Sequence, residues 1–260
     1  MSEYRLVQVD AFADRPFTGN PAAVMPLDAW LPDDVLQAIA MENNLAETAF
    51  TIDAQGDADF ELRWFTPTVE VSLCGHATLA SGHVLIGDRD QLRFRTRQSG
   101  ILTVARDGDR LSLDLPPTPV APAEHAQLLA ALGVEGPVFL SDPAKAAAIV
   151  LLEDAAAVRG CDPDFGKLKQ IDLLAIVTAP GDETDIISRV FVPAWGIDED
   201  PVTGAAHAAL TPFWSARLGC DAFSAYQASR RGGHVSCRSA SGRVILGGQC
   251  VTVLEGMFHL

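Results

Sequence analysis

Apolar and polar positions alternate along much of the chain in short runs, a pattern typical of β-strands that are buried on one face. Strands are predicted over residues 4–12, 22–25, 48–52 and 60–65. The breaker cluster Gly19-Asn20-Pro21 separates the first two strands. A helix is predicted over residues 32–41, because apolar positions recur at helical spacing and two aspartates fall in the first turn.

Residues 76–86 (HATLASGHVLI) predict a different kind of helix, which has hardly any polar face and is followed by Gly87. A helix that is apolar nearly all round must be buried on all sides. Because strands flank this segment in the sequence, the economical arrangement is a sheet curled around the helix.

The chain also repeats itself. Residues 63–80 return as residues 189–209, and each segment reads Arg-x-Phe-x-Pro, then a loop, then a glycine that opens an alanine-rich run. Residues 97–114 return as 230–247. The second half should therefore contain its own buried helix over residues 206–218, closed by Gly219 and kinked at Pro212.

The repeat predicts an α+β protein of two pseudo-symmetric domains, each a rolled, mostly antiparallel sheet around a central helix. The proline-rich segment 114–119 is the expected linker. The first domain is expected over residues 1–117, completed by a C-terminal strand within 249–260, and the second over 118–248. A ligand is expected in the cleft between the halves.

Charge and composition narrow the partners. With 34 acidic and 19 basic residues the formal net charge is -15, which disfavours a nucleic acid or an anionic membrane as partner and favours a small ligand. No apolar run reaches the roughly 18 residues of a membrane span. The first residues begin a strand pattern and show no secretory signal, so a cytoplasmic location is expected. The five cysteines form no Cys-x-x-Cys pair, which predicts free thiols.

Four polar residues stand out, and each has an ordinary structural interpretation beside the functional one. Glu47 enters an apolar strand, where burial would raise its pKa and suit a general acid/base, although an isolated glutamate more often faces water or an arginine. His76 follows a glycine at a helix start and could simply cap or fill the core. Asp200 precedes a proline in a turn, and Asn20 could be only a turn former.

Two glycine turns are expected to bind an anion. Gly75 and Gly204 each open a predicted helix, where free backbone N–H groups can hold a carboxylate. The six histidines include no pair at metal-ligand spacing, and no dinucleotide, P-loop or Gly-x-Ser-x-Gly motif is found. The residues thus favour proton transfer without a metal or cofactor.

Four segments in this order, VDAFADRPFTGNPAAV, MENNLAETAF, RWFTPTVEVSLCGHATLAS and DEDPVTGAAH, resemble the PhzF family of phenazine-biosynthesis-like isomerases. The likeness covers essentially the whole chain. It implies the diaminopimelate epimerase fold, a homodimer and a cofactor-free proton shift. It also implies that Glu47 is the catalytic acid/base, that His76 and Asp200 support it, and that Gly75 and Gly204 lie in anion-binding loops.

The residues expected to bind the substrate are Asn20, Gly75, His76, Ala77, Gly204 and Ala205. Two positions depart from the family pattern, which often has serine where this chain has Ala46 and Ala205. Both lost hydroxyls would line the pocket, so the phenazine precursor is in doubt as the substrate. The backbone N–H groups and Glu47 remain.

The leading interpretation is an isomerase that moves a proton on a small unsaturated or cyclic carboxylic acid. A racemase or epimerase with one thiol on each side of the substrate is the alternative, and Cys74 lies in the right loop for it. The matching loop around Gly204 has no cysteine, however. A non-catalytic protein that binds a small acid is the third possibility, which the intact Glu47 argues against. The sequence does not identify the substrate.

Overall fold

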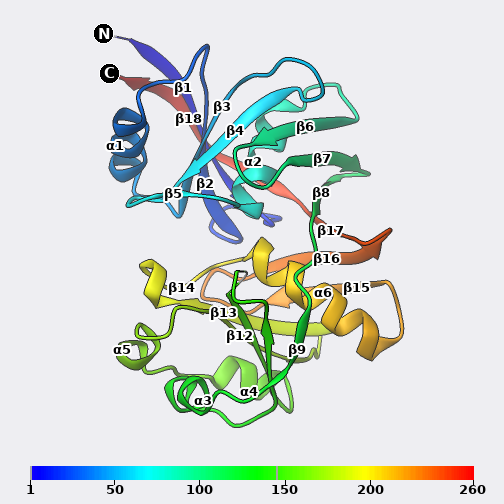
Figure 1. The fold of residues 1–260 in the computed structure, drawn as a ribbon. Coiled ribbons are helices and arrows are strands. Elements are labelled where there is room, and N and C mark those ends of the chain that lie inside the picture. The colour runs from blue at the N-terminus through cyan, green and yellow to red at the C-terminus, as the bar shows by residue number, and fades with distance from the viewer. Residues whose placement is uncertain (1, 145) are drawn as a thin grey trace. The chain divides into compact units, whose positions relative to one another are not determined.

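The computed structural model describes residues 2–144 and 146–260, which divide into two compact units (Figure 1). The first unit comprises the residues up to Leu115 together with Gly247–Leu260, and the second comprises Pro116–Leu246. The boundaries expected from the sequence, after residues 117 and 248, lie close to these. No helix among the described residues is long and apolar enough to span a bilayer.

The first unit is one sheet in which the strand order is β18-β1-β2-β3-β4-β6-β7-β8. The pairs β2/β3 and β4/β6 are parallel and the other neighbours antiparallel. The elements are β1 (Glu3–Ala11), β2 (Asn20–Pro26), α1 (Asp33–Asn43), β3 (Glu47–Asp53), β4 (Phe60–Phe65), β5 (Glu70–Val71), α2 (Gly75–Leu85), β6 (Gln91–Thr96), β7 (Ile101–Asp107), β8 (Arg110–Leu115) and β18 (Cys250–His259).

Helix α2 forms the core of this unit. Its residues from Gly75 to Gly82 are all buried, and the helix contacts β1, β2, β3, β7, β8 and β18. Strands from the whole width of the sheet thus surround one helix (Figure 1). The absence of a polar face in the sequence correctly predicted this arrangement, because no side of α2 can face water.

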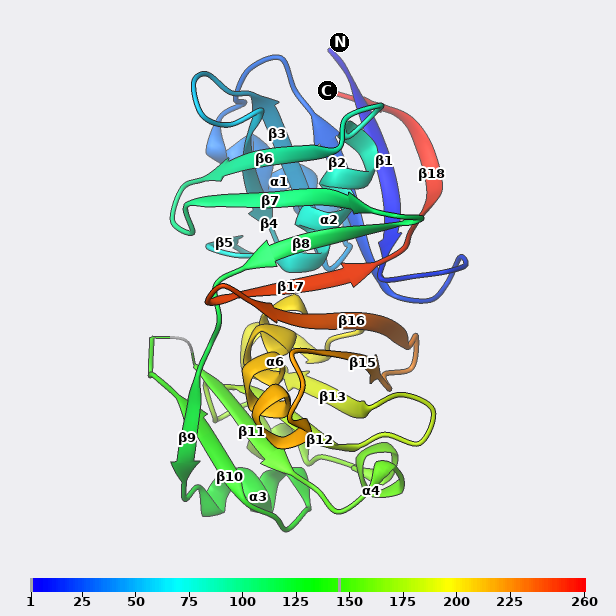
Figure 2. The same ribbon diagram turned by 90° about the vertical axis from the view of Figure 1, so that its right-hand side faces the viewer.

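The second unit has the same succession of pairings. Its order β9-β10-β11-β12-β13-β15-β16 again has two parallel pairs, β11/β12 and β13/β15, at matching places (Figure 2). Its elements are β9 (Val120–Ala123), α3 (Ala126–Leu132), β10 (Val138–Ser141), β11 (Ala147–Leu151), α4 (Ala155–Gly160), α5 (Phe165–Leu168), β12 (Leu174–Pro180), β13 (Ile186–Val192), the short 3-10 helix Pro193–Trp195, β14 (Ile197–Glu199), α6 (Gly204–Leu218), β15 (Ala222–Gln227) and β16 (Gly233–Ala240), and β17 (Arg243–Gly248) follows.

The repeated Arg-x-Phe-x-Pro motif has one structural role in both units. Arg63 donates from Nε and Nη2 to both carboxylate oxygens of Glu70, each at 2.8 Å, and lies 5.0 Å from the ring centroid of Phe65. Arg189 contacts Glu199 at 2.7 and 3.1 Å and lies 5.0 Å from the ring of Phe191. Each bidentate pair ties a strand to the short strand that leads to the central helix.

Helix and strand ends differ from the sequence predictions by a few residues. The two central helices begin at Gly75 and Gly204, which were expected to precede them. The final strand reaches His259 because it pairs with β1 along its whole length. Gly219 ends α6 in the left-handed conformation, as predicted.

Replacement of Gly82 by alanine should destabilise the first unit. A Cβ at this position would lie 2.4 Å from Cγ1 of Val104, whose β-branched side chain has little freedom to move. Overpacking typically costs about 1–3 kcal/mol, and an approach this close belongs in the upper part of that range, about 2–3 kcal/mol. The better helix propensity of alanine returns about 1 kcal/mol. We expect the free energy of unfolding, measured by urea denaturation, to fall by about 1–2 kcal/mol.

Gly256→Ala is the matched control, because a Cβ there meets no atom within 4 Å. Its stability should be unchanged or slightly higher. A Gly82→Ala protein as stable as the wild type would contradict the tight packing of α2.

Candidate active site

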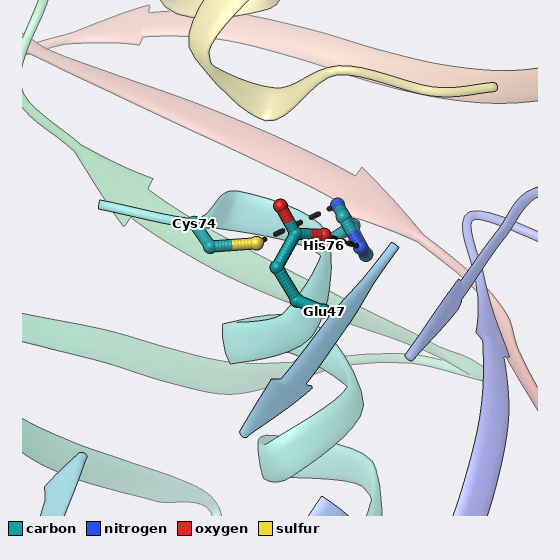
Figure 3. Close-up of side chains that lie close together, drawn as sticks. All are labelled: Glu47, Cys74 and His76. Atoms are coloured by element: carbon teal, nitrogen blue, oxygen red, sulfur yellow. Dashed lines mark hydrogen bonds and ion pairs between the residues drawn. The ribbon is translucent and has the colours of Figure 1, made fainter. Parts of the chain in front are cut away.

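The start of strand β3 and the start of helix α2 bring Glu47 and His76 together (Figure 3). Glu47 is the first residue of β3, and His76 is the second residue of α2. The Nε2 atom of His76 lies 2.9 Å from Oε2 of Glu47, and the two side chains are 4% and 14% exposed. Both atoms are buried without a partner in hydrogen-bond geometry, so their approach is an ionic contact.

The other ring nitrogen of His76 faces Asn20 and Cys74. Nδ1 lies 3.1 Å from Nδ2 of Asn20 and 3.6 Å from Sγ of Cys74. A neutral ring would accept a hydrogen bond at Nδ1 from this amide nitrogen and carry its proton on Nε2, toward Glu47. A doubly protonated ring would instead require the amide of Asn20 to turn its oxygen toward Nδ1, and the two orientations are nearly isosteric.

Burial and neighbouring groups act in opposite directions on His76. Burial by itself lowers the pKa of the imidazole, but the Cys74 sulfur and the Glu47 carboxylate together raise this pKa well above its ordinary value. Burial raises the pKa of the Cys74 thiol to about 11. The thiol therefore keeps its proton near neutral pH, and Glu47 is the group that supplies negative charge to the ring.

The N-terminus of α2 adds an anion-binding element beside this pair. Cys74 is the N-cap residue in an extended conformation, and its side chain does not cap the helix. The first backbone N–H groups of a helix, here those of Gly75, His76 and Ala77, have no acceptor within the helix. With the positive end of the helix dipole they favour a carboxylate.

In the second unit, the start of α6 is built in the same way around Asp200. The N-cap Thr203 is also extended and makes no side-chain cap, and Gly204 and Ala205 form the first turn. Thr203 donates from Oγ1 to Oδ2 of Asp200 at 2.5 Å. Gln227 holds the loop by accepting from the Thr203 N–H at 2.9 Å and donating to the Asp200 carbonyl at 2.7 Å.

Three polar contacts of the site were not predicted from the sequence, and they involve Asn20, Cys74 and Gln227. The sequence allows Asn20 to be either a binding residue or a simple turn former, and the structure buries it fully against His76. The contact of Cys74 with His76 was not foreseen. Gln227 was overlooked, and its only signal in the sequence was an amide in an otherwise alternating strand.

The structure groups the predicted site residues by unit. His76 contacts both Glu47 and Asn20, and Gly75 and Ala77 lie in the adjoining helix turn. Asp200, Gly204 and Ala205 belong to the second unit, at the start of α6. Their catalytic and binding roles remain predictions. Among the described residues, one group could also hold a metal ion: Glu47, Cys74 and His76 each offer a ligand atom, and these atoms lie within 4.8 Å of one another.

Comparison with known proteins identifies the class to which this fold and site belong. The chain belongs to the PhzC-PhzF family of phenazine biosynthesis-like proteins, which it matches over residues 9–256. An uncharacterized isomerase of Pseudomonas aeruginosa is 48% identical over 99% of this chain and 100% of its own length. An uncharacterized isomerase of Halalkalibacterium halodurans is 41% identical, with 95% of each chain covered.

Solved structures agree with this assignment. A PhzF family protein of Enterococcus faecalis superposes with a TM-score of 0.91 at 42% identity, over 100% of both chains. A hydroxyproline epimerase of Agrobacterium vitis, with bound trans-4-hydroxy-L-proline, has a TM-score of 0.62 at 12% identity, over 98% of this chain and 92% of its own. The second likeness concerns the fold alone. The predicted family, the α+β fold and the enzyme class of isomerase are thus confirmed.

His207 gives the second unit a histidine that should stay neutral in mild acid. It is fully buried in α6, its Nδ1 donates to the Thr203 carbonyl at 2.8 Å, and burial lowers its pKa from 6.5 to about 4. In the unfolded chain His207 binds a proton near its ordinary pKa of 6.5, whereas in the folded protein it does so only near pH 4. The stability contributed by the neutral side chain is therefore fully present above pH 6.5 and is lost as the pH falls toward 4.

We expect ring ¹⁵N chemical shifts to report the Nδ1–H tautomer of His207 down to about pH 5. The exposed His259 provides a reference signal in the same spectrum. Protonation of His207 at or above pH 6.5 would contradict the buried, uncharged environment described above.

Proposed function

We propose that this chain is a cofactor-independent isomerase that moves a proton on a small unsaturated or cyclic carboxylic acid, with Glu47 as the general acid/base. The observation that carries the proposal is the buried contact between Glu47 and His76 directly beside the uncapped N-terminus of α2. A base and an anion-binding element thus adjoin within one unit.

The chemistry needs a single mobile proton. The Glu47 carboxylate removes a proton from a carbon next to a carbonyl or unsaturated group, and the electron pair of that C–H bond enters the conjugated system. The carboxylic acid so formed returns the proton to another carbon of the same substrate, so no oxidant or reductant is consumed. His76 fixes the carboxylate through its 2.9 Å contact and is itself positioned by Asn20.

The substrate's own carboxylate would be held by the first turn of α2. The net charge of -15 opposes an anion at long range, but salt screens that field within about 8–10 Å. The N–H groups of Gly75, His76 and Ala77 act at contact distance in a buried place, where the local attraction exceeds the screened repulsion. Negative charge that develops during proton removal is stabilised in the same way.

Several finer points of the proposal rest on the family likeness. Asp200 is expected to support the same reaction, and Gly204 and Ala205 to bind substrate. The absence of hydroxyls at Ala46 and Ala205 favours a substrate with fewer hydroxyl or amino groups than the phenazine precursor, because an unpaired polar atom costs about 1–3 kcal/mol. Homodimer assembly, a cytoplasmic location and the absence of a nucleic-acid partner remain predictions.

A two-thiol racemase is the less favoured alternative. Cys74 lies at the site, but its thiol has a pKa of about 11 and is a poor base near neutral pH. The N-cap position of α6 that corresponds to Cys74 is Thr203, which provides no second thiol. A protein that only bound a small acid would not need the buried contact between Glu47 and His76, so that contact does not favour non-catalytic binding.

The direct test is a search for proton exchange with solvent. The wild-type protein is incubated in deuterated water with a panel of small cyclic and unsaturated carboxylic acids and with the corresponding amides and alcohols. We expect deuterium at a carbon next to the unsaturated group in at least one acid, detected by proton NMR or mass spectrometry. The neutral analogues should remain unlabelled because they lack the carboxylate that α2 would bind.

Labelling of only neutral or cationic compounds would contradict the anion site. Labelling of amino acids at the α-carbon, with inversion of configuration, would instead favour the racemase.

A further inference from the structure

We propose that Cys74, His76 and Glu47 bind one divalent cation of the zinc class, and that this cation blocks the proton-transfer site. The proposal goes beyond the isomerase function, because it concerns a metal as an inhibitor of the site. Its inhibitory part rests on the proposed function, whereas the binding itself does not.

The distance between the Cys74 sulfur and the nearer ring nitrogen of His76 matches the distance between two ligands of a zinc ion. Zinc binds thiolate sulfur at about 2.3 Å and imidazole nitrogen at about 2.0–2.1 Å, so tetrahedral geometry places the two ligand atoms about 3.5 Å apart. Sγ of Cys74 and Nδ1 of His76 are 3.6 Å apart. The separation of these two buried atoms thus already matches the one that an ion between them requires.

Glu47 supplies the third ligand. All three ligand atoms lie within 4.8 Å of one another, and Figure 3 shows the carboxylate beside the line from the Cys74 sulfur to the His76 ring. A tetrahedral site needs the oxygen about 3.4 Å from the imidazole nitrogen and about 3.6 Å from the sulfur, so the Glu47 side chain has to adjust wherever it lies beyond these distances. The Glu47 side chain is the more exposed partner of its contact with His76, at 14% against 4%.

The donor set selects the kind of ion. One thiolate, one imidazole and one carboxylate suit zinc and similar borderline-soft ions, whereas calcium and magnesium require oxygen ligands. Three protein ligands leave a fourth position for water, as in open zinc sites. The amide of Asn20, which lies 3.1 Å from Nδ1 of His76, must give up its hydrogen bond to that nitrogen.

Binding would change the chemistry of the site. The thiol of Cys74 loses its proton to solvent as the sulfur–metal bond forms, and the Glu47 carboxylate exchanges its contact with Nε2 of His76 for the metal. Coordination draws electron density from the Glu47 carboxylate and so makes it a much weaker acceptor for a substrate proton. The metal and the substrate proton therefore compete for the same oxygen.

Cobalt(II) is the probe that reports the ligands without any substrate. Metal-stripped protein is titrated with cobalt, and we expect one ion per chain with a sulfur-to-cobalt charge-transfer band and the intense visible bands of tetrahedral cobalt. Cys74→Ala should lose the charge-transfer band and at least about tenfold in affinity, since even residues that only orient a ligand cost 10–100-fold. Zinc should displace the cobalt.

Cys161→Ala is the matched control, because Cys161 is a free thiol with the same 6% exposure as Cys74. It should keep the wild-type spectrum and affinity. Circular dichroism checks that each variant is folded, and Cys74→Ser replaces Cys74→Ala if the alanine variant does not fold.

A wild-type spectrum without a charge-transfer band, or a band that persists in the folded Cys74 variant, would overturn the site. Zinc that binds but leaves the deuterium-exchange rate unchanged would overturn the inhibitory role. Because cobalt binding is measured without substrate, failure of the metal site is distinguishable from failure of the isomerase proposal.

Discussion

The burial of helix α2 from Gly75 to Gly82 is the constraint on which the first unit and its site depend. Over these residues the helix has no polar face to turn toward water, so the sheet must enclose it, and its polar side chains must be satisfied inside. Thr78 and Ser81 meet this requirement by donating to the carbonyls of Cys74 and Ala77 at 2.5 and 2.7 Å. Only the N-terminal turn keeps N–H groups without helical acceptors, and the polar groups of the site gather there.

The second unit repeats the scaffold but carries different chemistry. Both units tie the strand before the central helix with a bidentate arginine–glutamate pair, and both start that helix at an extended, uncapped residue. At the start of α2 the neighbours are a glutamate and a histidine in ionic contact. At the start of α6 they are Asp200 and the amide of Gln227, in a closed hydrogen-bond network. A duplicated fold has thus kept its backbone plan while its polar side chains diverged.

Local periodicity explains which features the sequence could predict. The apolar run of α2 and the Arg-x-Phe-x-Pro repeat are visible because their information lies within a few consecutive residues. The contact of Asn20 with His76 joins residues 56 positions apart, and that of Gln227 with Thr203 joins residues 24 apart. Such pairs depend on strand order and on the direction of single side chains, which hydrophobic periodicity does not specify. Glu47 stands out in the sequence because an acid in an apolar strand is unusual wherever the strand lies.

The proposed reaction requires Glu47 to carry the proton, and a comparison of exchange rates tests this requirement. Once an exchanging acid is known, the rate of deuterium incorporation is measured for the wild type, for Glu47→Gln and for Glu42→Gln, which changes an exposed glutamate of α1. The glutamine at position 47 keeps the size and polarity of the side chain but cannot accept the proton. We expect the rate of deuterium incorporation to fall about a hundredfold or more in Glu47→Gln and to stay unchanged in Glu42→Gln. Undiminished exchange in folded Glu47→Gln protein would contradict the proposed reaction and place the base elsewhere.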